Sequence, residues 1–137
     1  MKSWDELINA ARAAMQGERV ISPFMKGGYV ATALLTDLGN IYTAVNLESR
    51  CHLGSCSERF AVYKVFEANK NEKIVRCVCM YREKVDLPCG ACREFFMQYG
   101  NDSGEMEILL DIASKKSVKL KDTMSPWWGE PRMREGG

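Results

Sequence analysis

Two cysteine-containing segments constrain this chain more than any other feature of its sequence. In the first segment, Cys56 is followed two residues later by Glu58. In the second, Pro88 precedes a Cys-x-x-Cys motif formed by Cys89 and Cys92. A Cys-x-x-Cys motif alone discriminates little, because redox sites and structural zinc sites share it. The combined pattern is far more specific, and it indicates that two distant segments fold onto one site.

Both segments are expected at the beginnings of helices. The sequence predicts helices over residues 57–68 and 91–99, so Cys56 and Cys89 lie at or just before a first turn. Unpaired N–H groups and the positive end of the helix dipole favour thiolates there. Cys92, three residues after Cys89, comes to the same side of the first turn. The three thiolates can then converge on one Zn²⁺ and leave its fourth tetrahedral position open for water.

Glu58 is placed to reach that water without being a ligand, which is the arrangement that hydrolytic deamination requires. Zinc lowers the pKa of its water, so hydroxide becomes available near neutral pH. Hydroxide attacks the ring carbon that bears the amino group, and Glu58 would carry the proton to the ring nitrogen and then to ammonia. Zinc deaminases of nucleobases share this signature, with His or Cys as the first ligand. The pattern predicts a hydrolase with Glu58 as catalytic residue and one Zn²⁺ per subunit.

The remaining pattern predicts an α/β fold. A capping box begins at Ser3, and Gly17 is the expected end of the first helix. Strands are expected over residues 29–36, 41–47, 73–81 and 107–112, the first two joined by a hairpin turn. A strand–helix–strand crossover near the end predicts a parallel pair. We therefore expect a three-layer α/β/α sandwich with a mixed sheet in a single domain of residues 1–137, with its core at about 3–112 and a tail at about 114–137.

Composition excludes several classes of protein. The 137 residues carry a formal net charge of +1 and are 46% hydrophobic and 27% charged, as in ordinary globular domains. This balance provides no strong basic field, so a polynucleotide partner is not expected. The N-terminal residues do not resemble a signal peptide, and no run of about 18 apolar residues indicates a membrane span. We expect a cytoplasmic protein, whose six cysteines serve metal binding or catalysis before disulfides.

Residues 29–100 resemble the cytidine deaminase family, which includes the blasticidin-S deaminases. The shared features are two strands, both cysteine-bearing helices and the strand between them, in the family's order. The resemblance implies a cytidine-deaminase-like fold and, in pyrimidine salvage, the conversion of a cytosine nucleoside to its uracil counterpart. It also implies a homotetramer or a homodimer. By the same resemblance Asn46 and Glu48 bind the ribose hydroxyls, and Arg59 donates to a thiolate sulfur and offsets the charge of a three-cysteine site.

Departures from the family pattern concern the substrate. Cys-Ser-Glu replaces the commoner Cys-Ala-Glu, and Gly28 stands where an aromatic residue is usual. Phe24 is the candidate to replace that aromatic ring, provided that the intervening loop folds back. Trp127 and Trp128 are candidates to stack on the base, in their own or a neighbouring subunit, and ordinary docking of the tail is the alternative. The first strand and the tail favour blasticidin S, whereas the Asn-x-Glu motif favours cytidine.

Other interpretations of the same residues stay open at this point. A non-catalytic, zinc-stabilised interaction domain would use Cys51 or His52 as a fourth ligand. A redox Cys-x-x-Cys site would leave the first segment unexplained, and Glu58 alone would be an ordinary solvated helix charge. Cys77 and Cys79 alternate on one face of a predicted strand, which places them in the core.

Overall fold

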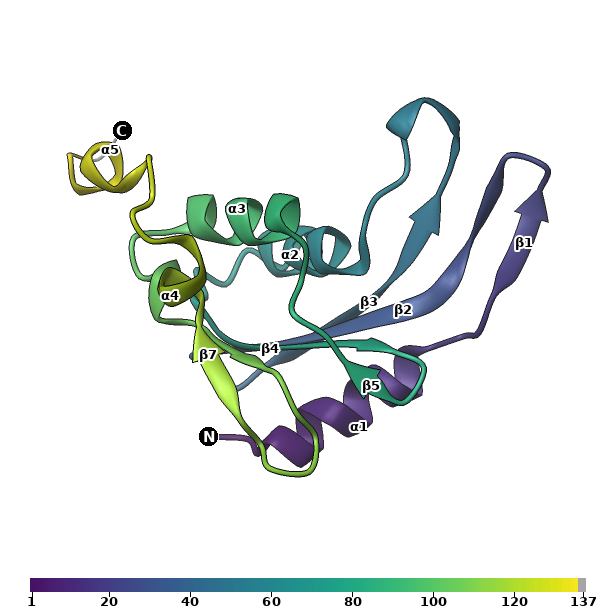
Figure 1. Ribbon diagram of the computed structural model, residues 1–137, viewed down its shortest axis with the longest axis horizontal. Coiled ribbons are helices and arrows are strands. Elements are labelled where there is room, and N and C mark those ends of the chain that lie inside the picture. Colours follow the sequence, from purple (N-terminus) through teal and green to yellow (C-terminus); the bar gives the residue numbers. More distant parts are fainter. Residues whose placement is uncertain (136–137) are drawn as a thin grey trace.

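The structure is a computed structural model that describes residues 1–135, so the last two residues of the expected tail lie outside the described residues. A mixed sheet of seven strands forms the middle layer of this part of the chain. Helix α1 (Trp4–Ala14) covers one face, and helices α2 (Ser57–Ala68) and α3 (Gly90–Tyr99) cover the other (Figure 1). The predicted three-layer α/β/α sandwich is confirmed.

The other elements are short, apart from the central strands. The strands are β1 (Arg19–Ser22), β2 (Met25–Thr36), β3 (Ile41–Glu48), β4 (Ile74–Tyr81), β5 (Lys84–Val85), β6 (Glu107–Leu109) and β7 (Ser117–Lys119). Two 3-10 turns, η1 (Arg50–His52) and η2 (Ser103–Glu105), and two C-terminal helices, α4 (Leu120–Met124) and α5 (Glu130–Arg134), complete the fold. Helix α1 ends three residues before Gly17, and β6 ends at Leu109 instead of residue 112.

Strand β2 organises the sheet. On one side it pairs antiparallel with β3 through the predicted hairpin turn at residues 37–40, whose Gly39 has a φ of 85°. On its other side it pairs with β1 along its first residues and with β4 along its last. Strand β4 then pairs parallel with β6, and β7 pairs antiparallel with β6. The parallel β4–β6 pair, with α3 in the connection, confirms the predicted crossover.

The alternation of side chains along β2 builds two cores. Odd-numbered residues such as Ala33 and Leu35 pack with Leu7 of α1 on one face. Even-numbered residues face α2 and α3, where Leu34 joins the apolar cluster. Because successive strand residues point to opposite faces, Thr32 also faces α2. A strand buried on both faces thus carries one polar side chain toward the start of α2.

The C-terminal segment belongs to this architecture. Strand β7 extends the sheet, and Leu120 is fully buried in the cluster under α2 and α3. The core therefore reaches past the expected limit at residue 112. Across residues 1–135, no helix is both long enough and apolar enough to span a membrane. The expected cytoplasmic location stays a prediction.

Candidate active site

Three cysteines from two helix N-termini converge on the α2–α3 side of the sheet. Cys56 is the N-cap residue of α2, Cys89 is the N-cap residue of α3, and Cys92 lies buried in the first turn of α3. Their sulfur atoms all lie within 4.8 Å of one another. The main-chain N–H of Cys92 lowers the pKa of the Cys89 thiol, as expected for a thiol at a helix N-terminus.

This donor set fits zinc. Tetrahedral coordination with Zn–S bonds of about 2.3 Å puts neighbouring sulfurs about 3.8 Å apart, a separation compatible with the observed cluster. Burial, and then the nearby Glu58 carboxylate, raise the pKa of the Cys92 thiol, so a thiolate there needs a cation beside it. Within the described chain the cluster includes neither Cys51 nor His52, both of which lie exposed in the 3-10 turn η1.

Arg59 lies over one of these sulfurs. Its Nη2 is 4.0 Å from the Sγ of Cys56, and this donation raises the pKa of the guanidinium. Its Nε is buried without a protein partner in residues 1–135. A guanidinium held against thiolate sulfur withdraws negative charge from a three-cysteine site, which is the effect that the family resemblance implies for this residue.

Glu58 is only 4% exposed, although it lies in the first turn of a helix. Three proton donors lie within hydrogen-bond distance of its Oε1: the hydroxyls of Ser57 (2.7 Å) and Thr32 (3.2 Å) and the thiol of Cys79 (3.2 Å). A solvated surface charge would not be held in this way. The interpretation of Glu58 as an ordinary surface residue is therefore wrong.

The sequence did not identify Thr32 or Cys79 as part of the site. Two signals in the sequence could have indicated them. Thr32 is a polar residue within an otherwise apolar strand, and Cys79 follows Cys77 by two residues, so both cysteines face the same side of their strand. Cys77 joins the apolar cluster as predicted, whereas Cys79 donates to Glu58. Burial raises the pKa of the Cys79 thiol, so it keeps its proton and remains a donor.

Asn46 and Glu48 lie at the end of β3, the edge strand next to α2. The Oδ1 of Asn46 accepts the main-chain N–H groups of Tyr29 (3.1 Å) and Val30 (3.0 Å), at the bulge where β2 shifts register against β3. The amide nitrogen of Asn46 is thus the group left for a ligand. Glu48 is exposed at the last position of the strand, opposite Lys26. Ribose binding by this pair stays a prediction.

A short bridge joins this strand end to the cysteine helix. Leu47 and Ser55 exchange two main-chain hydrogen bonds of 3.1 and 2.9 Å, immediately before Cys56. Gly54 permits the close approach, since a Cβ atom there would lie 2.1 Å from the Leu47 carbonyl oxygen. The bridge brings the Asn46 strand alongside the start of α2.

Phe24 lies in the turn between β1 and β2, the hairpin that projects from the sheet (Figure 1). Its ring is 63% exposed, and the guanidinium of Arg50 in η1 lies 5.7 Å from the ring centre. The contact of Phe24 with a base stays a prediction.

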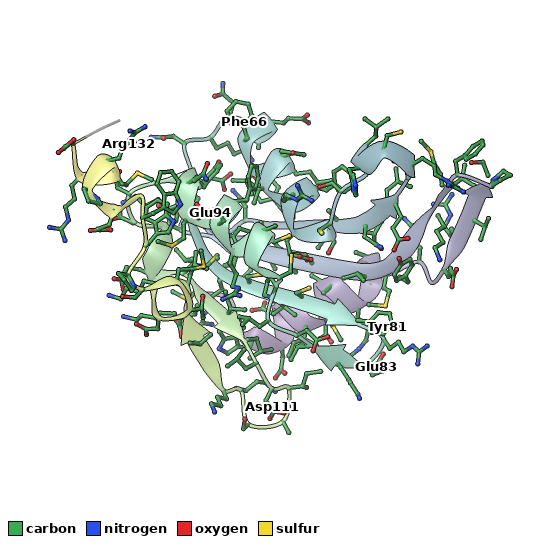
Figure 2. All side chains as sticks on the ribbon, turned by 45° about the horizontal axis from the view of Figure 1, so that its top comes forward. Phe66, Tyr81, Glu83, Glu94, Asp111 and Arg132 are labelled. Carbon is green, nitrogen blue, oxygen red and sulfur yellow. The ribbon has the colours of Figure 1, made fainter. Side chains whose placement is uncertain are left out.

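Both tail tryptophans dock on α3. The indole N–H groups of Trp127 (3.1 Å) and Trp128 (2.8 Å) donate to the carboxylate of Glu94, which lies on α3 beside the C-terminal segment (Figure 2). Trp127 also packs against the core, whereas Trp128 remains 66% exposed. These contacts agree with ordinary docking of the tail, and stacking on a base stays a prediction.

Comparison with known proteins gives the same fold and the same family. No protein-family model matches the chain. The cytidine deaminase of Sporosarcina psychrophila is 32% identical over 122 residues, which cover 85% of this chain and 86% of that protein. A probable cytidine deaminase of Dictyostelium discoideum is 38% identical over 74 residues, or 53% of this chain and half of that protein's length.

Solved structures extend this likeness to nearly the whole chain. The cytidine deaminase of Mycobacterium tuberculosis is 26% identical, with a TM-score of 0.73 over 94% of this chain and 99% of its own. That of Mycobacterium leprae, at 24% identity, has the same fold, with a TM-score of 0.73 over 91% of this chain and 99% of its own. Since the Sporosarcina enzyme is 32% identical to this chain and the match covers most of both proteins, this chain belongs to the cytidine deaminase family.

Proposed function

We propose that this chain catalyses the zinc-dependent hydrolytic deamination of a cytosine nucleoside, releasing ammonia and the uracil counterpart. The observation that carries the proposal is the cluster of three cysteine sulfurs within 4.8 Å of one another beside the buried carboxylate of Glu58. A structural zinc site would be closed by a fourth protein ligand, and neither Cys51 nor His52 joins this cluster among residues 1–135. The relatives named above are cytidine deaminases, which favours cytidine or deoxycytidine over blasticidin S.

In this proposal Cys56, Cys89 and Cys92 hold one Zn²⁺ per subunit. When bound, zinc lowers the pKa of water so that hydroxide is available near neutral pH. Glu58 accepts the proton of the attacking water and delivers it to the ring nitrogen beside the amino-bearing carbon. Glu58 then takes the proton of the new hydroxyl group on that carbon and passes it to the amino group, so the carbon–nitrogen bond breaks, ammonia leaves and the hydroxyl becomes the carbonyl of the uracil product.

Recognition of the sugar is assigned to the end of β3. The amide nitrogen of Asn46 donates to a ribose hydroxyl, and the Glu48 carboxylate accepts from one. The two side chains share a face because they are two residues apart on one strand. A small uncharged nucleoside also suits a chain with a formal net charge of +1.

We also propose that copies of the chain assemble as a homotetramer or homodimer. The outer surface of α2 carries two aromatic side chains that a monomer leaves to solvent, Tyr63 and the 73% exposed Phe66. Figure 2 shows Phe66 projecting from this helix. Light scattering during size-exclusion chromatography gives the subunit number, and a monomer at micromolar concentration would contradict this assignment.

The decisive experiment replaces Glu58 by Gln. Glu58→Gln keeps the size and one acceptor oxygen of the side chain but cannot carry the proton, so ammonia release from cytidine should fall about 10²–10⁴-fold while bound zinc is retained. The matched control is Glu67→Gln, an exposed position on the same helix, which should leave the rate unchanged. Near-full activity of Glu58→Gln would contradict the mechanism. Rates on cytidine, deoxycytidine and blasticidin S, measured side by side, identify the substrate.

A further inference from the structure

Side chains from three elements of the fold surround one oxygen of the Glu58 carboxylate. Thr32 comes from β2, Ser57 from the first turn of α2 and Cys79 from β4, and all three side chains are buried. Every one of them lies within hydrogen-bond distance of the same atom, Oε1. None of these three contacts involves Oε2.

Every proton donor in this cluster has an acceptor within the cluster. The hydroxyls of Thr32 and Ser57 lie 2.8 Å apart, and Ser57 is nearer to Oε1 (2.7 Å) than Thr32 is (3.2 Å). With one hydrogen on each hydroxyl, Thr32 donates to Ser57 and Ser57 donates to Glu58. The Cys79 thiol donates to Oε1 independently, and its burial keeps it protonated. Each donor therefore has an acceptor.

Stability alone does not call for such a network here. Thr32 stands between Ala31 and Ala33 in a strand buried on both faces, where apolar side chains pack without hydrogen-bond requirements. A buried polar cluster is unfavourable unless every member is satisfied, and in this protein all members converge on a single carboxylate oxygen. The arrangement fixes the rotation of that carboxylate about its last side-chain bond.

We propose that Thr32, Ser57 and Cys79 are positioning residues that anchor Glu58 through Oε1 and thereby reserve Oε2 as the atom that carries the proton. The inference rests on the proposed deamination. A proton shuttle has to exchange protons with the attacking water, the ring nitrogen and the leaving group in turn. An oxygen held in one position can reach all three without a change of side-chain conformation, which lowers the barrier of each transfer. Because the three donors act through Glu58, their loss should lower kcat and leave KM for the nucleoside nearly unchanged.

The fold supplies a matched control on the same strand. Thr36, four residues after Thr32, is also buried and donates at 2.7 Å to a buried carboxylate, that of Glu72. Thr32→Val and Thr36→Val remove the same hydroxyl at nearly constant volume, and both should lower Tm. Only Thr32→Val should lower kcat for cytidine, by about 10-fold or more. Thr32→Ser keeps the donor and should restore kcat to within about threefold of the wild type.

Double variants test the order of donation. Thr32→Val and Ser57→Ala interrupt one chain, so their effects on kcat should be less than additive, whereas Cys79→Ala should add its own effect. Zinc content is measured on every sample. A Thr32→Val protein with full zinc, lowered Tm and wild-type kcat would overturn the positioning role while leaving deamination intact. A wild-type protein that releases no ammonia from any cytosine nucleoside would contradict the proposed function itself, and this inference with it.

Discussion

The side-chain oxygen of Asn46 lies 3.0 Å from the main-chain nitrogen of Val30 and accepts its N–H. The same oxygen also accepts the N–H of Tyr29. The residue assigned to the sugar is therefore part of the fold as well, because it satisfies two main-chain donors at the bulge of β2. Its two functions use different atoms, so substitutions can separate them.

Asn46→Asp and Asn46→Ala should differ in this respect. Aspartate keeps an oxygen for Tyr29 and Val30 but loses the donor, so KM for cytidine should rise about 10-fold or more with little change in Tm. Alanine loses both the oxygen acceptor and the amide donor, so Asn46→Ala should also lower the free energy of unfolding by about 1–3 kcal/mol. Steady-state kinetics and urea unfolding measure the two effects. An unchanged KM in Asn46→Asp would remove Asn46 from the sugar site.

Acid should lower the stability of the fold through Glu72, whose hydrogen bonds join the β2–β3 hairpin to the segment between α2 and β4. Burial of this carboxyl would raise its pKa, but hydrogen bonds from Tyr42, Asn40 and Thr36 outweigh burial and hold the pKa below its usual value of 4.5. A carboxyl with a depressed pKa stabilises the protein above its unfolded-state pKa, and this contribution is lost as pH falls through the folded-state pKa.

Glu72→Gln should accordingly be less stable than the wild type at pH 7, by roughly 1 kcal/mol. The difference should shrink as the pH is lowered below 4.5. Thermal unfolding of both proteins from pH 7 to pH 3 measures it. A difference that stays constant over this range would contradict the pKa assignment.

Arg59 should matter to the metal site through its donation to the Cys56 sulfur. Arg59→Lys keeps the charge but loses the planar donor group, so zinc affinity or kcat should fall about 10–100-fold. Competition with a chelator measures zinc affinity, and ammonia release measures kcat. Arg12→Lys, the same change in an exposed ion pair with Glu83, should alter neither quantity.

The two tail tryptophans should differ in their contribution to stability. Trp127 packs against the core, so Trp127→Ala should lower the free energy of unfolding by about 2–3 kcal/mol. Trp128 is mostly exposed, and Trp128→Ala should cost less than about 1 kcal/mol. If Trp128 stacks on a base, Trp128→Ala raises KM at unchanged stability. Equal losses of stability in the two variants would contradict the docking described here.

Elements with their own local signals could be predicted from the sequence. Helix α2 has the predicted bounds, because its buried residues recur at helical spacing. Strand β3 and the turn at residues 37–40 could also be predicted from the sequence. Strand β1 was not predicted, since Arg19–Ser22 is short and mostly exposed and is defined only by its pairing with the start of β2. That pairing also moves the start of β2 from residue 29 to Met25.

The anchoring of Glu58 could not be predicted for a different reason. Alternation along β4 places Cys77 and Cys79 on one face, but it does not tell which part of a helix each one meets. Cys77 meets the apolar body of the α2–α3 layer, whereas Cys79 reaches the carboxylate in the first turn of α2. The position of α2 along the strands decides between core and site, and only tertiary packing sets that position.

The bridge between Leu47 and Ser55 has a consequence for how such a protein can diversify. Its two hydrogen bonds close residues 48–54 into a loop whose ends are fixed, so the loop can gain or lose residues without displacing Cys56. Doubling the length of a flexible loop costs only about 0.6 kcal/mol in closure entropy. Evolution can therefore vary the segment that follows β3 while the position of Cys56 at the start of α2 stays unchanged.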